Sequence, residues 1–197
     1  MANRTDAWTR TMKIVTTLGD TVTLTVVAVL VTIALLMLRQ ARSAVLVGAG
    51  SLIGYGLMVG LKHLIGRERP PAEARLLDID TFSMPSGHAM MATIVYGLIA
   101  VAVYHSSSWL RAHRLVLLVA PALAVSIGWS RVYLGVHWMT DVVTGWLLGV
   151  VFVASATYLA FRTDRPERRG SLDGSPSAVE TPQSSRTNPR PGPPDRS

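Results

Sequence analysis

Five apolar runs constrain this chain more than any other feature of its sequence. They cover residues 21–38, 43–61, 89–108, 115–130 and 142–161, and none contains Asp, Glu, Lys or Arg. Each is close to the ~20 residues that cross a bilayer core of ~30 Å, where backbone amides have no water to bond. Buried helices of a soluble bundle are the weaker alternative, because 49% of the chain is hydrophobic and only 16% is charged. We therefore expect an all-α, polytopic transmembrane helical bundle with about five spanning helices.

The character of the chain changes after the last run. Residues 163–197 are rich in Pro, Ser and Gly and nearly free of large apolar groups, so they cannot bury enough surface to fold. We expect a transmembrane domain over residues 1–162 and a disordered cytoplasmic tail over 163–197. The absence of cysteine excludes disulfides and thiolate chemistry.

The basic residues indicate an orientation in the membrane. The formal net charge is +7, but these residues sit between apolar runs and form no basic helix face, so a nucleic-acid partner is not expected. Three basic clusters would lie on one side, which the positive-inside rule makes cytoplasmic. They are Arg39 with Arg42, Arg111 with Arg114, and Arg162 with the basic residues that follow it. The loops 62–88 and 130–141 then face the extracytoplasmic side.

The N-terminus fits this orientation less well. Arg4, Arg10 and Lys13 would lie outside, against the rule. Two explanations stay open: a short interfacial segment anchored by Trp8, or a further helix upstream of the given start.

Charged and polar groups gather in the two outer loops and would meet at one membrane face. The set holds cations (Lys62, Arg69, Arg131), a Ser86-Gly87 turn at a helix start, two histidines (His88, His137) and one carboxylate (Asp141). Arginine forks and a lysine charge match phosphate oxygens, and a helix N-terminus offers unpaired N–H groups to an anion. We therefore expect a phosphate-binding site.

The histidines divide naturally into two roles. His137 and Asp141 are four apart and would share a helix face, so the carboxylate accepts the Nδ1 proton and leaves Nε2 as a nucleophile for phosphorus. His88 would protonate the leaving group and later take a proton from water. The other histidines and the charges at Arg67, Glu68, Glu73 and Arg75 are interpreted as ordinary loop groups. Asp78 and Asp80 make too thin a metal site, so no metal or other cofactor is expected.

The spacing of these residues resembles that of a known family. Lys-x6-Arg-Pro (62–70), Pro-Ser-Gly-His (85–88) and Ser-Arg-x5-His-x3-Asp (130–141) are similar to the motifs of the type 2 phosphatidic acid phosphatase superfamily and of the related vanadium haloperoxidases and acid phosphatases. The resemblance covers residues 17–161. It implies a metal-independent phosphatase in which Lys62, Arg69, Ser86, Gly87 and Arg131 bind phosphate. It also implies that His88 is the acid and that His137 with Asp141 is the nucleophilic pair.

The resemblance also leaves alternatives. Membrane members commonly have six spanning helices and five are expected here, so the first helix of the pattern is missing. The leading hypothesis is an integral membrane phosphatase of a lipid phosphate: a polyprenyl diphosphate, phosphatidic acid or phosphatidylglycerol phosphate. A phosphotransferase would use the same site, and a non-catalytic anionic-lipid binder would need neither histidine. A haloperoxidase would need vanadate, and its relatives are soluble. The sequence carries no signal of oligomeric state.

Overall fold

The structure, a computed structural model, describes residues 5–162, and all regular elements in that part are helical. The helices are α1 (Asp6–Thr17), α2 (Thr21–Met37), α3 (Ala41–Ile65), α4 (Gly87–Ser106), α5 (Ser108–Ala112), α6 (Val119–Tyr133) and α7 (Met139–Phe161), with 3-10 turns η1 (Ala72–Ala74) and η2 (Arg114–Leu118). The all-α class is thereby confirmed for this part of the chain. The predicted tail lies outside the described residues, so that domain boundary stays a prediction.

The helices reproduce the five apolar runs as membrane spans. Four segments of residues 5–162 are long and apolar enough to cross a bilayer: Ala41–Ile65, Gly87–Ser106, Arg114–Tyr133 and Met139–Phe161. A fifth arises if α1 and α2, bent by 43° at their junction, count as one span. Large apolar side chains are exposed along these helices, including Leu30, Val45 and Leu147. An apolar exterior of this kind suits lipid and not water.

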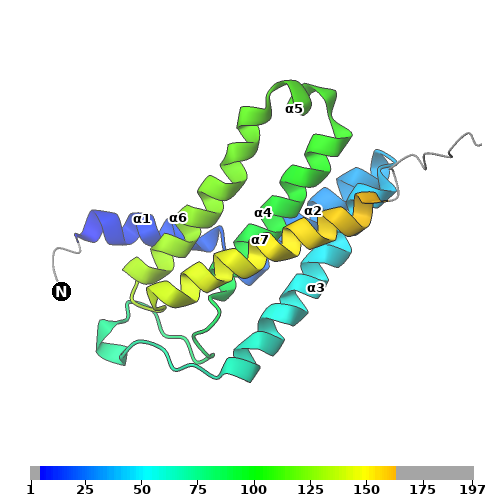
Figure 1. Cartoon of the computed structure of the whole chain (residues 1–197). Coiled ribbons are helices and arrows are strands. Elements are labelled where there is room, and N and C mark those ends of the chain that lie inside the picture. Colours follow the sequence, from blue (N-terminus) through cyan, green and yellow to red (C-terminus); the bar gives the residue numbers. More distant parts are fainter. Residues whose placement is uncertain (1–4, 163–197) are drawn as a thin grey trace, which may run out of the picture. The chain divides into compact units, whose positions relative to one another are not determined.

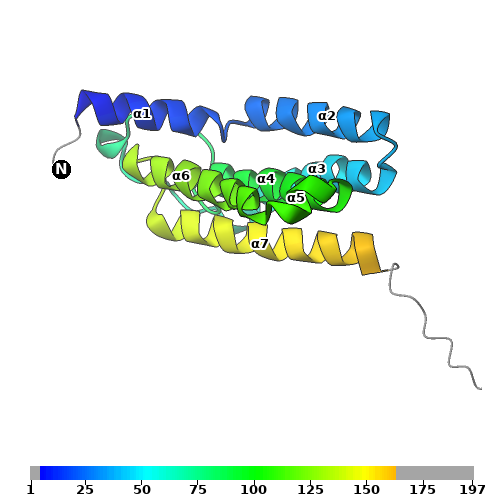
Figure 2. The same ribbon diagram turned by 90° about the horizontal axis from the view of Figure 1, so that it is seen from above.

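Helix α4 occupies the centre of the bundle and packs against α2, α3, α6 and α7 (Figures 1 and 2). Ile94 and Leu98 on α4 are fully buried. The glycines of α3 allow the close contact with α4, since a Cβ at Gly50 would lie 2.7 Å from Leu98 Cδ1 and one at Gly54 would lie 2.9 Å from Ile94 Cδ1. Gly50 and Gly54 thus form a packing surface, as small residues do in membrane helix pairs.

Helix α1 forms the N-terminal segment for which the sequence left two explanations open. It has 12 residues, too few to span a bilayer alone. It packs against α6, where Thr9 Oγ1 lies 3.3 Å from the Tyr133 hydroxyl. Residues 18–20 form a break between α1 and α2, which are bent by 43° relative to each other.

The helix directions set the two ends of the bundle. Helix α3 ends, and α4 and α7 begin, at the end that carries the loops 66–86 and 134–138. The basic residues at 39, 42, 111, 114 and 162 lie at the opposite ends of the same helices. The structure thus separates the predicted site from the basic clusters, as the alternating topology requires.

Candidate active site

The predicted site residues come together at the loop end of the bundle. A single cavity of about 1000 Å³ is lined by six of the eight: Lys62, Arg69, Gly87, His88, Arg131 and His137. The other two, Ser86 and Asp141, are fully buried. The Ser86 N–H donates to the Asp141 carbonyl at 3.0 Å, which ties the start of α4 to the start of α7.

The start of α4 presents backbone donors to this cavity. Ser86 is the N-cap residue, and its hydroxyl accepts from the Ala89 N–H at 3.5 Å. Gly87 follows as the first helical residue and lines the cavity. Because the first N–H groups of a helix have no partner within it and carry the positive end of its dipole, this terminus favours an anion.

Three cations surround the cavity, and two of them hold the loop in place. Lys62 Nζ donates to the Phe82 carbonyl at 2.7 Å. Arg69 donates to the Thr81 side chain at 2.9 Å and to the Val136 carbonyl at 2.7 Å. These contacts tie the loop at Thr81 and Phe82 to Lys62 on α3 and to Arg69, and they fix both positively charged groups at the cavity.

Arg131 is buried in the last turn of α6, with only 2% of its surface exposed. Its Nη1 donates to Thr16 Oγ1 on α1 at 2.7 Å. Its Nε is buried without any hydrogen-bond partner among residues 5–162. A buried guanidinium donor without a partner is costly, and a phosphate oxygen in the adjoining cavity would satisfy it.

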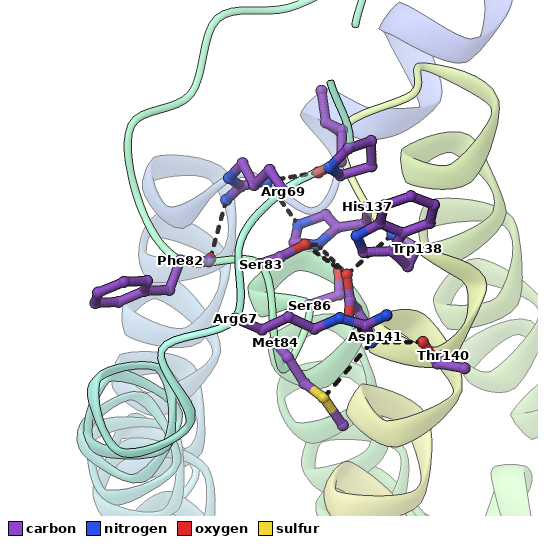
Figure 3. Close-up of polar contacts among 12 residues, drawn as sticks. Arg67, Arg69, Phe82, Ser83, Met84, Ser86, His137, Trp138, Thr140 and Asp141 are labelled. Carbon is purple, nitrogen blue, oxygen red and sulfur yellow. Dashed lines mark hydrogen bonds and ion pairs between the residues drawn. The ribbon is translucent and has the colours of Figure 1, made fainter. Parts of the chain in front are cut away.

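The hydrogen bonds around His137 determine its tautomer (Figure 3). The hydroxyl hydrogen of Ser83 goes to Asp141 Oδ2 at 2.5 Å, so its oxygen can only accept from His137 Nδ1 at 3.3 Å. On the other edge of the ring, Arg69 Nη1 lies 3.3 Å from Nε2 and can only donate. Both neighbours therefore place the proton on Nδ1 and the lone pair on Nε2, as the sequence predicts.

The surroundings of His137 also favour its neutral form. Burial lowers the pKa of His137 to about 4, and the charges of Arg69, Arg131 and Lys62 act in the same direction. The hydrogen bond toward Asp141 opposes them but is outweighed. The imidazole is thus an uncharged base beside three cations at neutral pH.

Asp141 lies behind His137 and is held from several sides (Figure 3). Besides Ser83, its Oδ2 accepts from the Trp138 N–H at 2.9 Å and lies 3.4 Å from His137 Nδ1. The shared helix face expected for His137 and Asp141 is wrong, because α7 begins at Met139 and leaves His137 in the preceding loop. The pair meets instead because Asp141, the third residue of α7, closes a capping box onto Trp138.

Arg67 belongs to this network, which corrects its interpretation as an ordinary loop charge. Its Nη1 lies 2.8 Å from Asp141 Oδ1 and 2.6 Å from Thr140 Oγ1, and its guanidinium lies 5.7 Å from the Trp138 ring centre. The other oxygen of the buried carboxylate therefore has a positive partner. Such pairing is what allows a carboxylate to stay ionised at zero exposure.

Three residues of this site escaped the sequence interpretation: Ser83, Arg67 and Asp20. Ser83 lies two residues before the 85–88 motif and Arg67 lies inside the 62–70 motif, so their proximity to the motif residues was the available signal. Asp20 lies at the break between α1 and α2, and its Oδ1 is 2.7 Å from His88 Nε2. Its only signal was a carboxylate next to an apolar run.

The cavity continues away from these polar groups as an apolar groove between α2 and α3. Its walls there include Leu24, Ala28 and Thr32 on α2 and Gly48 and Leu52 on α3. From Lys62 to Gly48 the groove follows α3 for roughly 20 Å at 1.5 Å per residue. One cavity thus joins a phosphate-sized polar end to a long apolar channel inside the membrane span.

Comparison with known proteins agrees with this geometry. A family model described as the PAP2 superfamily matches residues 43–165. The chain belongs to the PAP2 superfamily. The match covers α3 to α7 and thus every motif residue, and it confirms the family that the motif spacing resembles.

Individual PAP2 relatives are named as phosphatases. The chain is 45% identical over 92 residues to phosphatidylglycerophosphatase B of Bacillus subtilis, covering 46% of this chain and 45% of that protein. It is 30% identical over 134 residues to decaprenylphosphoryl-5-phosphoribose phosphatase of Mycobacterium tuberculosis, covering 66% and 69%. The first match thus spans less than half of that relative.

A solved structure shares the fold. The crystal structure of a transmembrane PAP2-type phosphatidylglycerolphosphate phosphatase from Bacillus subtilis superposes with a TM-score of 0.75 at 32% identity, over 82% of this chain and 81% of the other. Together with the apolar helices, this likeness shows that the present chain is an integral membrane protein.

Proposed function

We propose that this PAP2 protein is a membrane lipid phosphatase that hydrolyses a phosphomonoester or diphosphate at the end of a lipid. The observation that carries the proposal is the cavity itself, whose polar end holds Lys62, Arg69, Arg131 and both histidines while its apolar arm runs between α2 and α3. A soluble phosphate ester would not need that arm. A lipid fills both parts at once, with its phosphate at the cations and its chain in the groove.

The reaction begins with attack by His137 Nε2 on phosphorus. The lone pair forms the N–P bond, the bond to the leaving oxygen breaks, and His88 gives that oxygen a proton. Asp141, through Ser83, stabilises the positive charge that develops on the His137 ring. Lys62, Arg69 and Arg131, with the α4 N-terminus at Ser86 and Gly87, stabilise the transferring phosphoryl oxygens.

Water completes the cycle. His88, now neutral, takes a proton from a water molecule that attacks the phospho-histidine, and the N–P bond breaks to release phosphate. The three cations supply the positive charge that a metal ion provides in other phosphatases. We therefore expect turnover without added metal.

The lipid class follows from the groove and from the relatives. A groove of roughly 20 Å along α3 accepts a long chain, whether acyl or prenyl. Relatives of this chain are named for a glycerolipid phosphate and for a decaprenyl-linked phosphate. Phosphatidylglycerol phosphate, phosphatidic acid and a polyprenyl diphosphate are accordingly the candidate substrates.

The site is proposed to face the extracytoplasmic side. The basic residues at 39, 42, 111, 114 and 162 lie at the opposite ends of the helices from the site. The positive-inside rule places that basic end in the cytoplasm. Labelling of an introduced cysteine in the 71–82 loop of sealed cells, by a reagent that does not cross membranes, tests this orientation.

The decisive experiment is phosphate release by the purified protein in EDTA from the three candidate lipids. His137→Gln is expected to lower turnover by about 10³-fold or more if the covalent step is real. His113→Gln, at an exposed position outside the cavity, is the matched control. Unchanged turnover in His137→Gln would refute the nucleophile.

The same reaction mixtures distinguish hydrolysis from transfer. With radiolabelled substrate and an alkaline quench, label should appear on the protein only when His137 is present. It should then appear as free phosphate. Label recovered in a second lipid or sugar would identify a phosphotransferase instead.

A further inference from the structure

The break between α1 and α2 reaches into the active site from outside the matched family region. Residues 18–20 join the two helices at a bend of 43°, whereas the PAP2 match begins at residue 43. Asp20 is the N-cap residue of α2, with the extended backbone that this position requires. An aspartate there ordinarily accepts a bond from the first turn of its own helix. The Asp20 side chain makes no such bond.

Asp20 reaches across to α4 instead. Its Oδ1 lies 2.7 Å from His88 Nε2, the distance of a charge-assisted hydrogen bond. The side chain gives up the capping bond, which ordinarily stabilises a helix. The carboxylate is therefore directed at the second histidine of the site.

The surrounding contacts fix the break in this position. Gly19 is buried so closely that a Cβ would lie 2.4 Å from Ile127 Cγ2 and 3.1 Å from His88 Cδ2. The Tyr96 hydroxyl donates to the Leu18 carbonyl at 2.8 Å, which satisfies a carbonyl that the break leaves without a helix partner. A glycine followed by an aspartate thus places the carboxylate against the edge of His88 that bears Nε2.

The contact with Asp20 decides which His88 nitrogen remains available. With Nε2 bonded to Asp20, Nδ1 is the ring nitrogen without a partner among the described residues. His88 lines the cavity that holds the cations, so a phosphate ester bound there would meet that free nitrogen. Arg131 and Arg69 are the cations whose charges act on His88, and Asp20 is the carboxylate that acts against them.

We propose that Asp20 is a positioning residue for proton transfer by His88, because it accepts the Nε2 hydrogen and leaves Nδ1 to exchange a proton with the leaving-group oxygen. This inference rests on the proposed phosphatase function. In the first step the P–O bond breaks, its electron pair goes to the leaving oxygen, and that oxygen takes the Nδ1 proton. His88 is left neutral with its remaining proton on Nε2, held by Asp20. In the second step Nδ1 takes a proton from the attacking water.

The test compares two substrates that differ only in the leaving group. One is dodecyl phosphate, whose alkoxide needs a proton to leave. The other is an ortho-nitrophenyl phosphate carrying the same dodecyl chain, whose phenolate leaves without one. Asp20→Asn keeps an oxygen that can accept from Nε2 and removes the charge, so the bend should fold. Asp20→Glu restores the charge, and Asp6→Asn removes an exposed carboxylate at the far end of α1 as the control.

Asp20→Asn should lower kcat/KM for dodecyl phosphate by about 10- to 100-fold, part of the range for general acid catalysis, and change it by less than about twofold for the nitrophenyl ester. Asp20→Glu should recover part of the loss, and Asp6→Asn should match the wild type. Equal losses on both esters, or none on dodecyl phosphate, would overturn the assignment.

A double-mutant cycle gives a second test that does not depend on the absolute activity of one variant. If Asp20 acts through His88, then Asp20→Asn should have no further effect once His88 is replaced by Gln. An additional loss of similar size in the double variant would show that Asp20 acts elsewhere. A wild-type protein that cleaves neither ester would overturn the proposed function itself, whereas an active wild type with an unaffected Asp20→Asn variant overturns only this inference.

Discussion

Acidification offers the most direct check on the state of the nucleophile. Only 2% of the His137 side chain is exposed, and burial lowers its pKa from 6.5 to about 4. That lowering corresponds to about 3 kcal/mol against protonation in the folded protein, with little correction for solvent because the ring is buried. Because the pKa in the folded protein lies below the ordinary value, the neutral ring persists as the pH falls through 6.5 and is lost only near pH 4.

The size of this pKa shift distinguishes His137 from an ordinary histidine. At about pH 5.5 an imidazole with the usual pKa would be only about one-tenth neutral, whereas one with a pKa of about 4 would be more than about nine-tenths neutral. The supply of His137 nucleophile should therefore change little between pH 7 and 5.5, and any loss of kcat/KM in that range must come from another group or from the substrate.

The assay is a titration of ring-labelled histidine by NMR in detergent micelles. The chain has five histidines, so the His137 signal can be assigned by its loss in His137→Gln. We expect its midpoint near pH 4, with the neutral form protonated on Nδ1. A midpoint near 6.5 would refute the lowered pKa of His137. A neutral ring protonated on Nε2 would refute the hydrogen bonds assigned to Ser83 and Arg69.

Three further predictions address the carboxylate network, the groove and the packing. Ser83→Ala removes a buried bond to Asp141 worth about 1.5–3 kcal/mol, so kcat should fall about 10- to 100-fold with little change in KM, as steady-state kinetics will show. Ser51 lines the groove with a buried hydroxyl that has no partner among the described residues, and Ser51→Phe should lower kcat/KM for long-chain lipids while sparing short-chain ones. Gly149→Val would place a Cβ 2.7 Å from Thr93 Cβ. Thermal unfolding in detergent should therefore show that the free energy of unfolding falls by about 1–3 kcal/mol. Equal activity of Ser51→Phe on both chain lengths would contradict the prediction for the groove. An unchanged melting temperature of Gly149→Val would contradict the prediction for the packing.

The sequence was sufficient for the spans and for the motif residues. Lipid leaves helices as the only option for a long apolar run, so the run boundaries and the helix boundaries agree to within a few residues. The motif spacing identified six residues that line the polar end of the cavity, but not His63 or the loop residues Thr81 and Phe82. His137 and Asp141 do lie together, but a capping box and not a shared helix face brings them into contact.

The missed residues share a physical cause. Arg67 and Ser83 meet Asp141 only because the loop from 66 to 86 folds back over the start of α7, and no local periodicity encodes that path. Asp20 meets His88 across 68 positions of sequence through a helix break. The residue type alone was ambiguous at all three positions, since a polar residue near an apolar run is as well explained by exposure to water.

The two histidines, for which we propose opposite tasks, differ in their surroundings within a single cavity. Each has a carboxylate partner, but Asp141 is fully buried and bonded from three other residues, whereas 46% of the Asp20 side chain is exposed. His137 is linked to Asp141 through Nδ1 and Ser83, so its lone pair is on Nε2. His88 is bonded to Asp20 through Nε2, so its Nδ1 has no partner among the described residues. The rigid pair suits the atom that must attack along one line. The pair at the helix break, where water can enter, suits the group that must exchange protons with water in every cycle.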